Sequence, residues 1–148
     1  MTSSPDVTIE IVTYRDATAD IQTIRRQVFQ QEQGVSAELE FDGLDDDAIH
    51  LLAYHQEQAV GTCRLRNLGE EITKVERVAV LVSHRGQGIG RQLMVSAIDY
   101  LTHQGVQTIK ISAQTQVEAF YERLGFETVG EVFQEAGIPH VTMWLSSR

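Results

Sequence analysis

This sequence of 148 residues contains one cysteine, two prolines and no long run of apolar residues. A single cysteine cannot form a disulfide within the chain, which fits a reducing compartment. No stretch approaches the roughly eighteen apolar residues of a membrane span, and the first residues lack the basic and apolar stretches of a signal peptide. We therefore expect a cytoplasmic protein that does not interact with membranes.

Basic residues are also scarce, since 12 Lys and Arg stand against 21 Asp and Glu, for a net charge of −9. Nucleic-acid binding needs clustered Lys and Arg, so we expect no nucleic-acid partner. Most of the negative charge is interpreted as a solubilising surface, although it could attract a cationic amine. The length and the 42% hydrophobic content predict one domain over residues 1–148.

The most informative segment covers residues 77–93 and reads RVAVLVSHRGQGIGRQL. An apolar run typical of a strand ends at Val82, and the loop Arg85-Gly86-Gln87-Gly88-Ile89-Gly90 then opens a helix. The first turn of a helix has unpaired N–H groups and the positive end of the helix dipole, and glycine lets the backbone approach a phosphate closely. This segment therefore predicts a site for a phosphate-bearing ligand, with His84, Arg85 and Arg91 as the nearest cations.

Alternation, helical spacing and turn residues predict the remaining elements. Helices are expected from Asp16 or Thr18 to Gln33, from Gly88 to Gln104 and from Gln116 to Leu124, and an acidic loop covers residues 34–47. Strands are expected at 7–14, 49–55, 59–66, 72–82, 107–113, 126–133 and 140–145. This order predicts an α/β (α+β) fold, a mixed and mostly antiparallel sheet of about seven strands flanked by helices.

The spacing of the glycines narrows the class of ligand. A Walker A loop needs Gly-Lys-Ser/Thr, but Gly90 is followed by Arg91-Gln92. The dinucleotide fingerprint G-x-G-x-x-G does not match either, because the spacing here is G-x-G-x-G. The loop resembles the pyrophosphate loop of the GNAT superfamily of acyl-CoA N-acyltransferases, Arg/Gln-x-x-Gly-x-Gly/Ala. A glycine turn that binds no ligand, or a nucleotide-binding protein, remains the alternative.

A second segment carries the same resemblance. Residues 120–126, Phe-Tyr-Glu-Arg-Leu-Gly-Phe, are similar to a GNAT motif whose tyrosine protonates the departing thiolate, and Tyr121 matches that tyrosine. The resemblance implies that Val78-Ala79-Val80 lines the acetyl and pantetheine arm and splays from the strand near 109–112. A backbone N–H near Val80 would polarise the thioester. Gln114 stands where many members carry an asparagine that contacts the cofactor arm.

Two residues are candidates for the base that takes the proton from the amine. Glu76 lies two residues before Val78, on the same strand face if alternation holds. His140 follows Pro139, which fixes the local backbone, and histidine is the usual proton carrier near neutral pH. Glu76 is slightly favoured because it adjoins the strand expected to hold the thioester, and an exposed glutamate paired with Lys74 or Arg77 is the structural alternative.

The segment Glu135 to Met143, E-x-G-I-P-H-x-x-M, resembles the C-terminal signature of a small bacterial GNAT subgroup. The same subgroup carries residues that match Arg25, Phe29 and Glu32, which share a helix face by spacing. One hypothesis is an acceptor pocket formed by this helix, the acidic loop and residues 135–140. The other is a helix salt bridge and a structural turn.

These features together predict an acetyltransferase that moves the acetyl group of acetyl-CoA to a primary amine, on a small molecule or a peptide, by direct transfer in a ternary complex. A non-catalytic acyl-CoA-binding module is the alternative. The spacing of acids and histidines predicts no metal site. Cys63 is expected to be a packed strand residue. The sequence leaves open whether the chain is a monomer or a homodimer.

Overall fold

A computed structural model describes residues 6–146, which form one sheet in the strand order β1-β2-β3-β4-β5-β7-β6. The strands are β1 (Val7–Thr13), β2 (Ile49–His55), β3 (Gln58–Gly69), β4 (Ile72–Val80), β5 (Thr108–Gln114), β6 (Glu127–Glu135) and β7 (Ile138–Ser146). The predicted fold class, a mixed and mostly antiparallel seven-stranded sheet flanked by helices, is confirmed.

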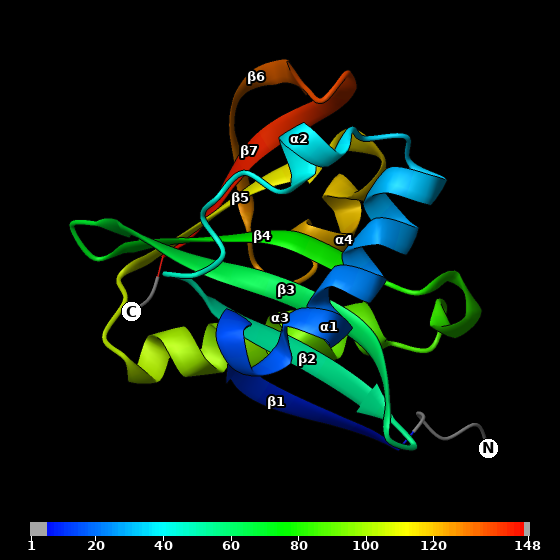
Figure 1. The fold of residues 1–148 in the computed structure, drawn as a ribbon. Coiled ribbons are helices and arrows are strands. Elements are labelled where there is room, and N and C mark those ends of the chain that lie inside the picture. Colours follow the sequence, from blue (N-terminus) through cyan, green and yellow to red (C-terminus); the bar gives the residue numbers. More distant parts are fainter. Residues whose placement is uncertain (1–5, 147–148) are drawn as a thin grey trace.

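Helices cover both faces of this sheet (Figure 1). They are α1 (Tyr14–Arg25), the π-helix η1 (Arg26–Glu32), α2 (Ala37–Glu40), the 3₁₀ turn η2 (Val82–His84), α3 (Ile89–His103), the 3₁₀ turn η3 (Thr115–Val117) and α4 (Glu118–Glu122). Helices α1 and α2 lie in front of the sheet in Figure 1, and α3 lies behind it.

Helix α3 packs tightly against β3 because the sheet presents a glycine there. Its apolar stripe is buried and includes Ile89, Leu93 and Met94. A Cβ at Gly61 would lie 3.0 Å from a Leu93 methyl carbon and 3.3 Å from an Ile89 methyl carbon. The absence of a side chain at Gly61 thus allows the close contact that fixes the first turn of α3 over the sheet.

The only parallel neighbours in the sheet are β4 and β5, and they separate soon after they begin. Three residue pairs join them, from Ile72–Thr108 to Lys74–Lys110. Beyond these pairs β4 continues beside β3, while β5 pairs with β7 over its whole length. Figure 1 shows β5 and β7 rising away from β4. The splaying expected between residues 78–80 and 109–112 is therefore present.

Strand β4 contains a bulge close to this opening. Arg64 pairs with Glu76, and the next residue on the same face of β3, Thr62, pairs with Ala79. One residue of β3, Cys63, thus lies opposite two of β4, Arg77 and Val78, and Arg77 has the left-handed φ of 56°. The bulge shifts the alternation of β4 between Glu76 and Ala79.

Several predicted boundaries differ from the structure. The first helix begins at Tyr14, capped by Thr13 rather than by Asp16 or Thr18, and it continues as the π-helix η1. The predicted acidic loop contains the short helix α2, capped by Ser36. Strands β6 and β7 are joined by a two-residue turn at Ala136-Gly137, both with positive φ, instead of a five-residue loop.

Candidate functional site

The first turn of α3 has the geometry of an anion site. Gly86 and Gly88 have φ of 77° and 83°, and a side chain at either position would meet nothing within 4 Å. The Gln92 N–H donates to the Gly88 carbonyl at 3.0 Å, so the helical bonds begin there. The preceding N–H groups, those of residues 89–91, therefore have no helical acceptor and are available to a phosphate.

The side chain of Arg85 does not contribute to this turn. Its Nε donates to the Val80 carbonyl at 2.8 Å, and its two terminal nitrogens donate to the two oxygens of Glu32. Arg85 therefore connects η1 to the end of β4 instead of adding a free cation to the loop. Glu32 is committed to this contact and does not line the cavity described next.

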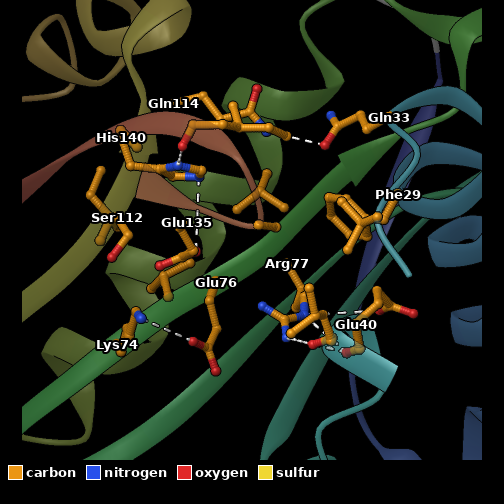
Figure 2. Close-up of a pocket in the computed structure, with 18 of the residues that line it drawn as sticks. Phe29, Gln33, Glu40, Lys74, Glu76, Arg77, Ser112, Gln114, Glu135 and His140 are labelled. Carbon is orange, nitrogen blue, oxygen red and sulfur yellow. Dashed lines mark hydrogen bonds and ion pairs between the residues drawn. The ribbon is translucent and has the colours of Figure 1, made fainter. Parts of the chain in front are cut away.

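A cavity of about 330 Å³ fills the opening between β4 and β5. We call it the wedge cavity (Figure 2). Its walls come from β4 at residues 74–78, from β5 at residues 111–114 and from the β6–β7 hairpin. Phe29 of η1 and Gln33, which follows η1, complete them on the helix side. Gln114 donates to the Gln33 side-chain oxygen at 3.1 Å and so connects β5 with that helix across the cavity.

His140 presents a proton acceptor to the wedge cavity. It lies opposite Gln114 on β5, and its Nδ1 is 2.7 Å from the Ile138 carbonyl oxygen. A carbonyl oxygen can only accept, so in the neutral ring Nδ1 carries the proton and Nε2 carries the lone pair. Nε2 lies 3.8 Å from the Glu135 carboxylate, and the ring stacks on Phe133. Glu135 therefore places a carboxylate near the nitrogen that carries the lone pair.

Tyr121 on α4 contributes a phenol to the same cavity. Its side chain is 8% exposed and makes edge contacts with Phe120 and Phe126, at centroid distances of 5.0 and 5.9 Å. Burial raises the pKa of Tyr121 well above that of an ordinary phenol. The hydroxyl therefore stays protonated at neutral pH and can act as a proton donor.

Glu76 also lines the cavity, but its carboxylate is already paired with cations. Oε2 accepts from Arg64 and, at 2.8 Å, from Arg66, and Oε1 lies 3.4 Å from the Lys74 ammonium. Burial favours a raised pKa for Glu76, but the Arg66 hydrogen bond and the charges of Arg64 and Lys74 outweigh it, and the pKa is lowered. The assumption that Glu76 and Val78 share a face is wrong, because the bulge at Arg77 lies between them.

The acidic segment is held against the sheet by a buried ion network. Arg25, which is fully buried, donates to Glu40 and, at 2.6 Å, to Asp45. Arg64, also fully buried, donates to Asp45 at 3.0 Å and to both oxygens of Asp42 at 2.9 Å. Glu40, Asp42 and Asp45 are therefore structural and do not belong to the solubilising surface that was expected for most of the negative charge.

Only one of the three helix residues predicted for an acceptor pocket reaches the cavity. Phe29 lines it, whereas Arg25 is enclosed in the ion network and Glu32 pairs with Arg85. The π-helix rotates the later residues relative to an α-helix, since Gln33 N–H bonds five residues back to the Val28 carbonyl. A face assigned by α-helical spacing therefore does not continue past Arg25.

Two cavity residues, Arg77 and Gln33, were not expected from the sequence. Arg77 enters the wall because of the bulge, which no sequence pattern marks. Lys74 was considered only as a partner of Glu76, although it also faces the cavity (Figure 2). The arginines at positions 64 and 66, on the strand that pairs with β4, carried one usable signal, since alternating cations on a buried strand need nearby acids.

Cys63 is buried, and burial raises the pKa of its thiol to about 12, so it is a packed strand residue as predicted. Between residues 6 and 146, no group of three or more His, Cys, Asp or Glu side chains is arranged to hold a metal ion. No helix in that range is both long and apolar enough to cross a bilayer.

The splayed parallel strands, the glycine turn of α3 and the cavity between them define the class of acyl-CoA N-acyltransferases. An acyl-CoA N-acyltransferase from Pseudomonas aeruginosa superposes with a TM-score of 0.83 at 30% identity, over 95% of this chain and 100% of that one. A structure from Lactobacillus plantarum, provisionally named an N-acetyltransferase, has a TM-score of 0.89 at 29% identity, over 95% and 97% of the two chains.

The sequence comparisons agree with the structural ones. The model of the Acetyltransferase (GNAT) domain matches residues 12–147. A Bacillus subtilis protein provisionally named an acetyltransferase is 44% identical over 123 residues, which cover 81% of this chain and 83% of that protein. The chain belongs to the GNAT family of N-acetyltransferases, enzymes that use an acyl-CoA donor.

Proposed function

We propose that this enzyme transfers the acetyl group of acetyl-CoA directly to a primary amine in a ternary complex. The observation that carries the proposal is the wedge cavity, which is lined by both a proton acceptor, His140 Nε2, and a proton donor, the Tyr121 hydroxyl. Direct transfer needs both groups, because the amine must lose a proton and the thiolate must gain one.

The donor site is proposed to lie along β4 and the first turn of α3. Acetyl-CoA supplies the acetyl thioester and a pyrophosphate. The N–H groups at residues 86–91 would hold the pyrophosphate. The backbone at residues 78–80 has no strand partner on the β5 side, because β4 and β5 separate there, and it would bind the pantetheine amides. The Val80 N–H would polarise the thioester carbonyl, and Gln114 would contact the cofactor arm.

His140 is proposed as the base in preference to Glu76. A base needs a free lone pair, and the hydrogen bond from Nδ1 to Ile138 leaves that lone pair on Nε2, at the cavity. Both oxygens of Glu76 already contact cations, and its lowered pKa makes it a weaker proton acceptor. The protonated His140 would then be stabilised by Glu135.

The atoms balance in one cycle. The amine nitrogen forms a bond to the acetyl carbon, its proton passes to His140 Nε2, and the C–S bond breaks. Tyr121 gives its proton to the thiolate and later regains one from solvent, and His140 releases the proton of the amine to solvent, so both groups return to their starting state. Phe29 would form an apolar wall for the acceptor.

The experiment that tests this proposal measures release of the CoA thiol over a panel of primary amines. Acetyl-CoA should bind the purified protein and raise its melting temperature, whereas NAD and ATP should not. Turnover with at least one amine supports the transferase. Tight acetyl-CoA binding without turnover over a broad panel would favour the non-catalytic binding module, and no acetyl-CoA binding would contradict both.

A further inference from the structure

The carboxylates at the wall of the wedge cavity have little capacity left for a ligand. Glu76 accepts from Arg64 and Arg66 on one oxygen and faces Lys74 with the other. Both oxygens of Asp42 accept from Arg64, and one of them also accepts from Arg77 at 3.2 Å. Glu76 and Asp42 are therefore satisfied within the protein, whereas the Glu135 carboxylate, which also lines the cavity, lies near His140.

The basic groups of the same wall are not satisfied in this way. Among residues 6–146, the Lys74 ammonium contacts only Glu76, at the long distance of 3.4 Å. Arg66 uses only its Nε, and one terminal nitrogen of Arg77 has no acceptor in the described chain. All three side chains line the cavity. They leave several charged N–H donors available on the side of the cavity away from His140 (Figure 2).

The ion network behind this wall contains one more basic side chain than acidic side chains. Five basic side chains and four acidic ones form the connected ion network, namely Arg25, Arg64, Arg66, Lys74 and Arg77 with Glu40, Asp42, Asp45 and Glu76. The network thus carries an excess positive charge in a protein of net charge −9. Because Glu135 also lines the cavity, basic and acidic side chains are balanced in the network and the cavity together, and this region does not share the strongly negative charge of the whole protein.

We propose that the acceptor is a small amino acid, whose carboxylate is held by Lys74 with Arg66 and Arg77 while its amine is directed to His140. This inference rests on the proposed function. A carboxylate would use the free N–H donors in charge-assisted hydrogen bonds. A polyamine would set a second ammonium against Lys74 and Arg77 and would be disfavoured. A volume of about 330 Å³ is at the lower end for ligand pockets, which fits one small molecule.

The test compares matched acceptors by release of the CoA thiol. Each standard amino acid is assayed beside its amide and its decarboxylated amine, which keep the amino group and lose the carboxylate charge. For at least one amino acid, kcat/KM should exceed that of both partners by about ten- to a hundredfold, the range for hydrogen bonds to a charged group. Equal or better turnover of the uncharged partners would overturn the inference and leave the proposed function standing.

Two variants locate the effect. Lys74→Gln should raise KM for the preferred amino acid at least tenfold, with a smaller change in kcat and in the acetyl-CoA affinity. Lys110 is the matched control, because it is the register partner of Lys74 on the neighbouring strand β5 but does not line the cavity. Lys110→Gln should leave KM unchanged, and equal effects of both variants would overturn the assignment.

Binding measured by calorimetry separates the remaining outcomes. The enzyme is saturated with CoA and titrated with amino acids and with their decarboxylated amines. If acetyl-CoA binds but no amino acid binds or reacts, the inference fails while the donor site stands. If acetyl-CoA itself does not bind, the proposed function fails.

Discussion

At the scale of single residues, the wedge cavity joins two groups that are suited to opposite proton transfers. His140 carries a lone pair fixed by the Ile138 carbonyl, and Tyr121 carries a proton that burial retains. Their proposed roles are separable, because His140 would act on the amine and Tyr121 on the thiolate. Each role therefore predicts a different loss on substitution.

Tyr121→Phe keeps the ring packing against Phe120 and Phe126 and removes only the hydroxyl. We expect kcat to fall about ten- to ten-thousandfold, the range of general acid effects, with acetyl-CoA affinity nearly unchanged. Steady-state kinetics and calorimetry measure the two quantities. Tyr100→Phe on α3 is the control and should retain full activity. Wild-type turnover of Tyr121→Phe would make this tyrosine a packing residue only.

His140→Asn and Glu76→Gln distinguish the two candidate bases. If His140 takes the proton, His140→Asn should remove the ascending acidic limb of the pH–rate profile and lower kcat about a hundredfold or more. Glu76→Gln should keep the limb and should instead destabilise the fold, because Arg64 and Arg66 lose a charged partner. The profile is measured at saturating acetyl-CoA. Loss of the limb in Glu76→Gln alone would restore Glu76 as the base.

At the scale of elements, the N-terminus of α3 is the proposed position of the pyrophosphate. Gly88 precedes the helix with a φ of 83°, and the space around it is open. A carboxylate introduced there would accept from the N–H groups of the first turn and would occupy the anion site from within the chain. It would also repel a pyrophosphate.

Gly88→Asp should therefore weaken acetyl-CoA binding on the order of a hundredfold or more, since opposing like charges costs several kcal/mol. Calorimetry on the folded variant measures this loss. Gly105→Asp is a matched control, because Gly105 follows the same helix with the same φ of 83° and open surroundings. Gly105→Asp should keep the acetyl-CoA affinity. Unchanged binding in Gly88→Asp would remove the anion site from the donor site.

The elements that the sequence predicted best have a regular period and a clear stop. Helix α3 has its apolar residues at helical spacing and ends before Gly105, and β5 alternates strictly, with Ile109, Ile111 and Ala113 buried. The strands expected at 49–55 and 59–66 are also present, and a turn with positive φ at Gln56 and Glu57 joins them. Local pattern is sufficient where one face of an element packs on one surface.

Elements shaped by distant partners were not predictable in this way. Arg77 at the bulge and Arg25 before the π-helix both contact the acidic segment, which lies far from β4 in the sequence. Strand alternation and helical spacing both assume a regular backbone. The expected faces, Glu76 with Val78 on the strand and Arg25 with Glu32 on the helix, relied on a regularity that is absent. The roles of the site residues and the C-terminal motif from Glu135 to Met143 stay predictions.

At the scale of the whole molecule, the buried ion network makes the stability of the fold decrease at acidic pH. The pKa values of Asp42, Asp45 and Glu76 are lowered, since the arginine hydrogen bonds and charges outweigh desolvation. A carboxyl with a lowered folded pKa stabilises the protein above its unfolded pKa of about 4 and loses this contribution as the pH falls toward its folded pKa.

Urea unfolding from pH 7 to pH 2.5 should therefore show a free energy of unfolding that falls below about pH 4.5. Asp42→Asn should lower that free energy by about 1–3 kcal/mol at pH 7, with a smaller loss at pH 3, because one charged partner of Arg64 is removed. Asp99→Asn changes an exposed acid on α3 and should have an effect below about 0.5 kcal/mol. Equal losses at both pH values would mean that Asp42 contributes by shape and not by charge.

The short pairing between β4 and β5 has a mechanical consequence. The sheet has two parts, or plates, formed by β1-β2-β3-β4 and by β5-β7-β6. Only three residue pairs join them, and we call this junction the seam. A molecule that binds to both sides of the seam would hold the two plates together. At a concentration of 100 Kd it would stabilise the closed sheet by about 2.7 kcal/mol relative to a state that does not bind it. When acetyl-CoA is bound, the amide hydrogens at residues 75–80 should exchange with solvent more slowly. The exchange rate of the β1 amides should fall by a smaller factor. Uniform slowing over all strands would indicate that the sheet already moves as one plate.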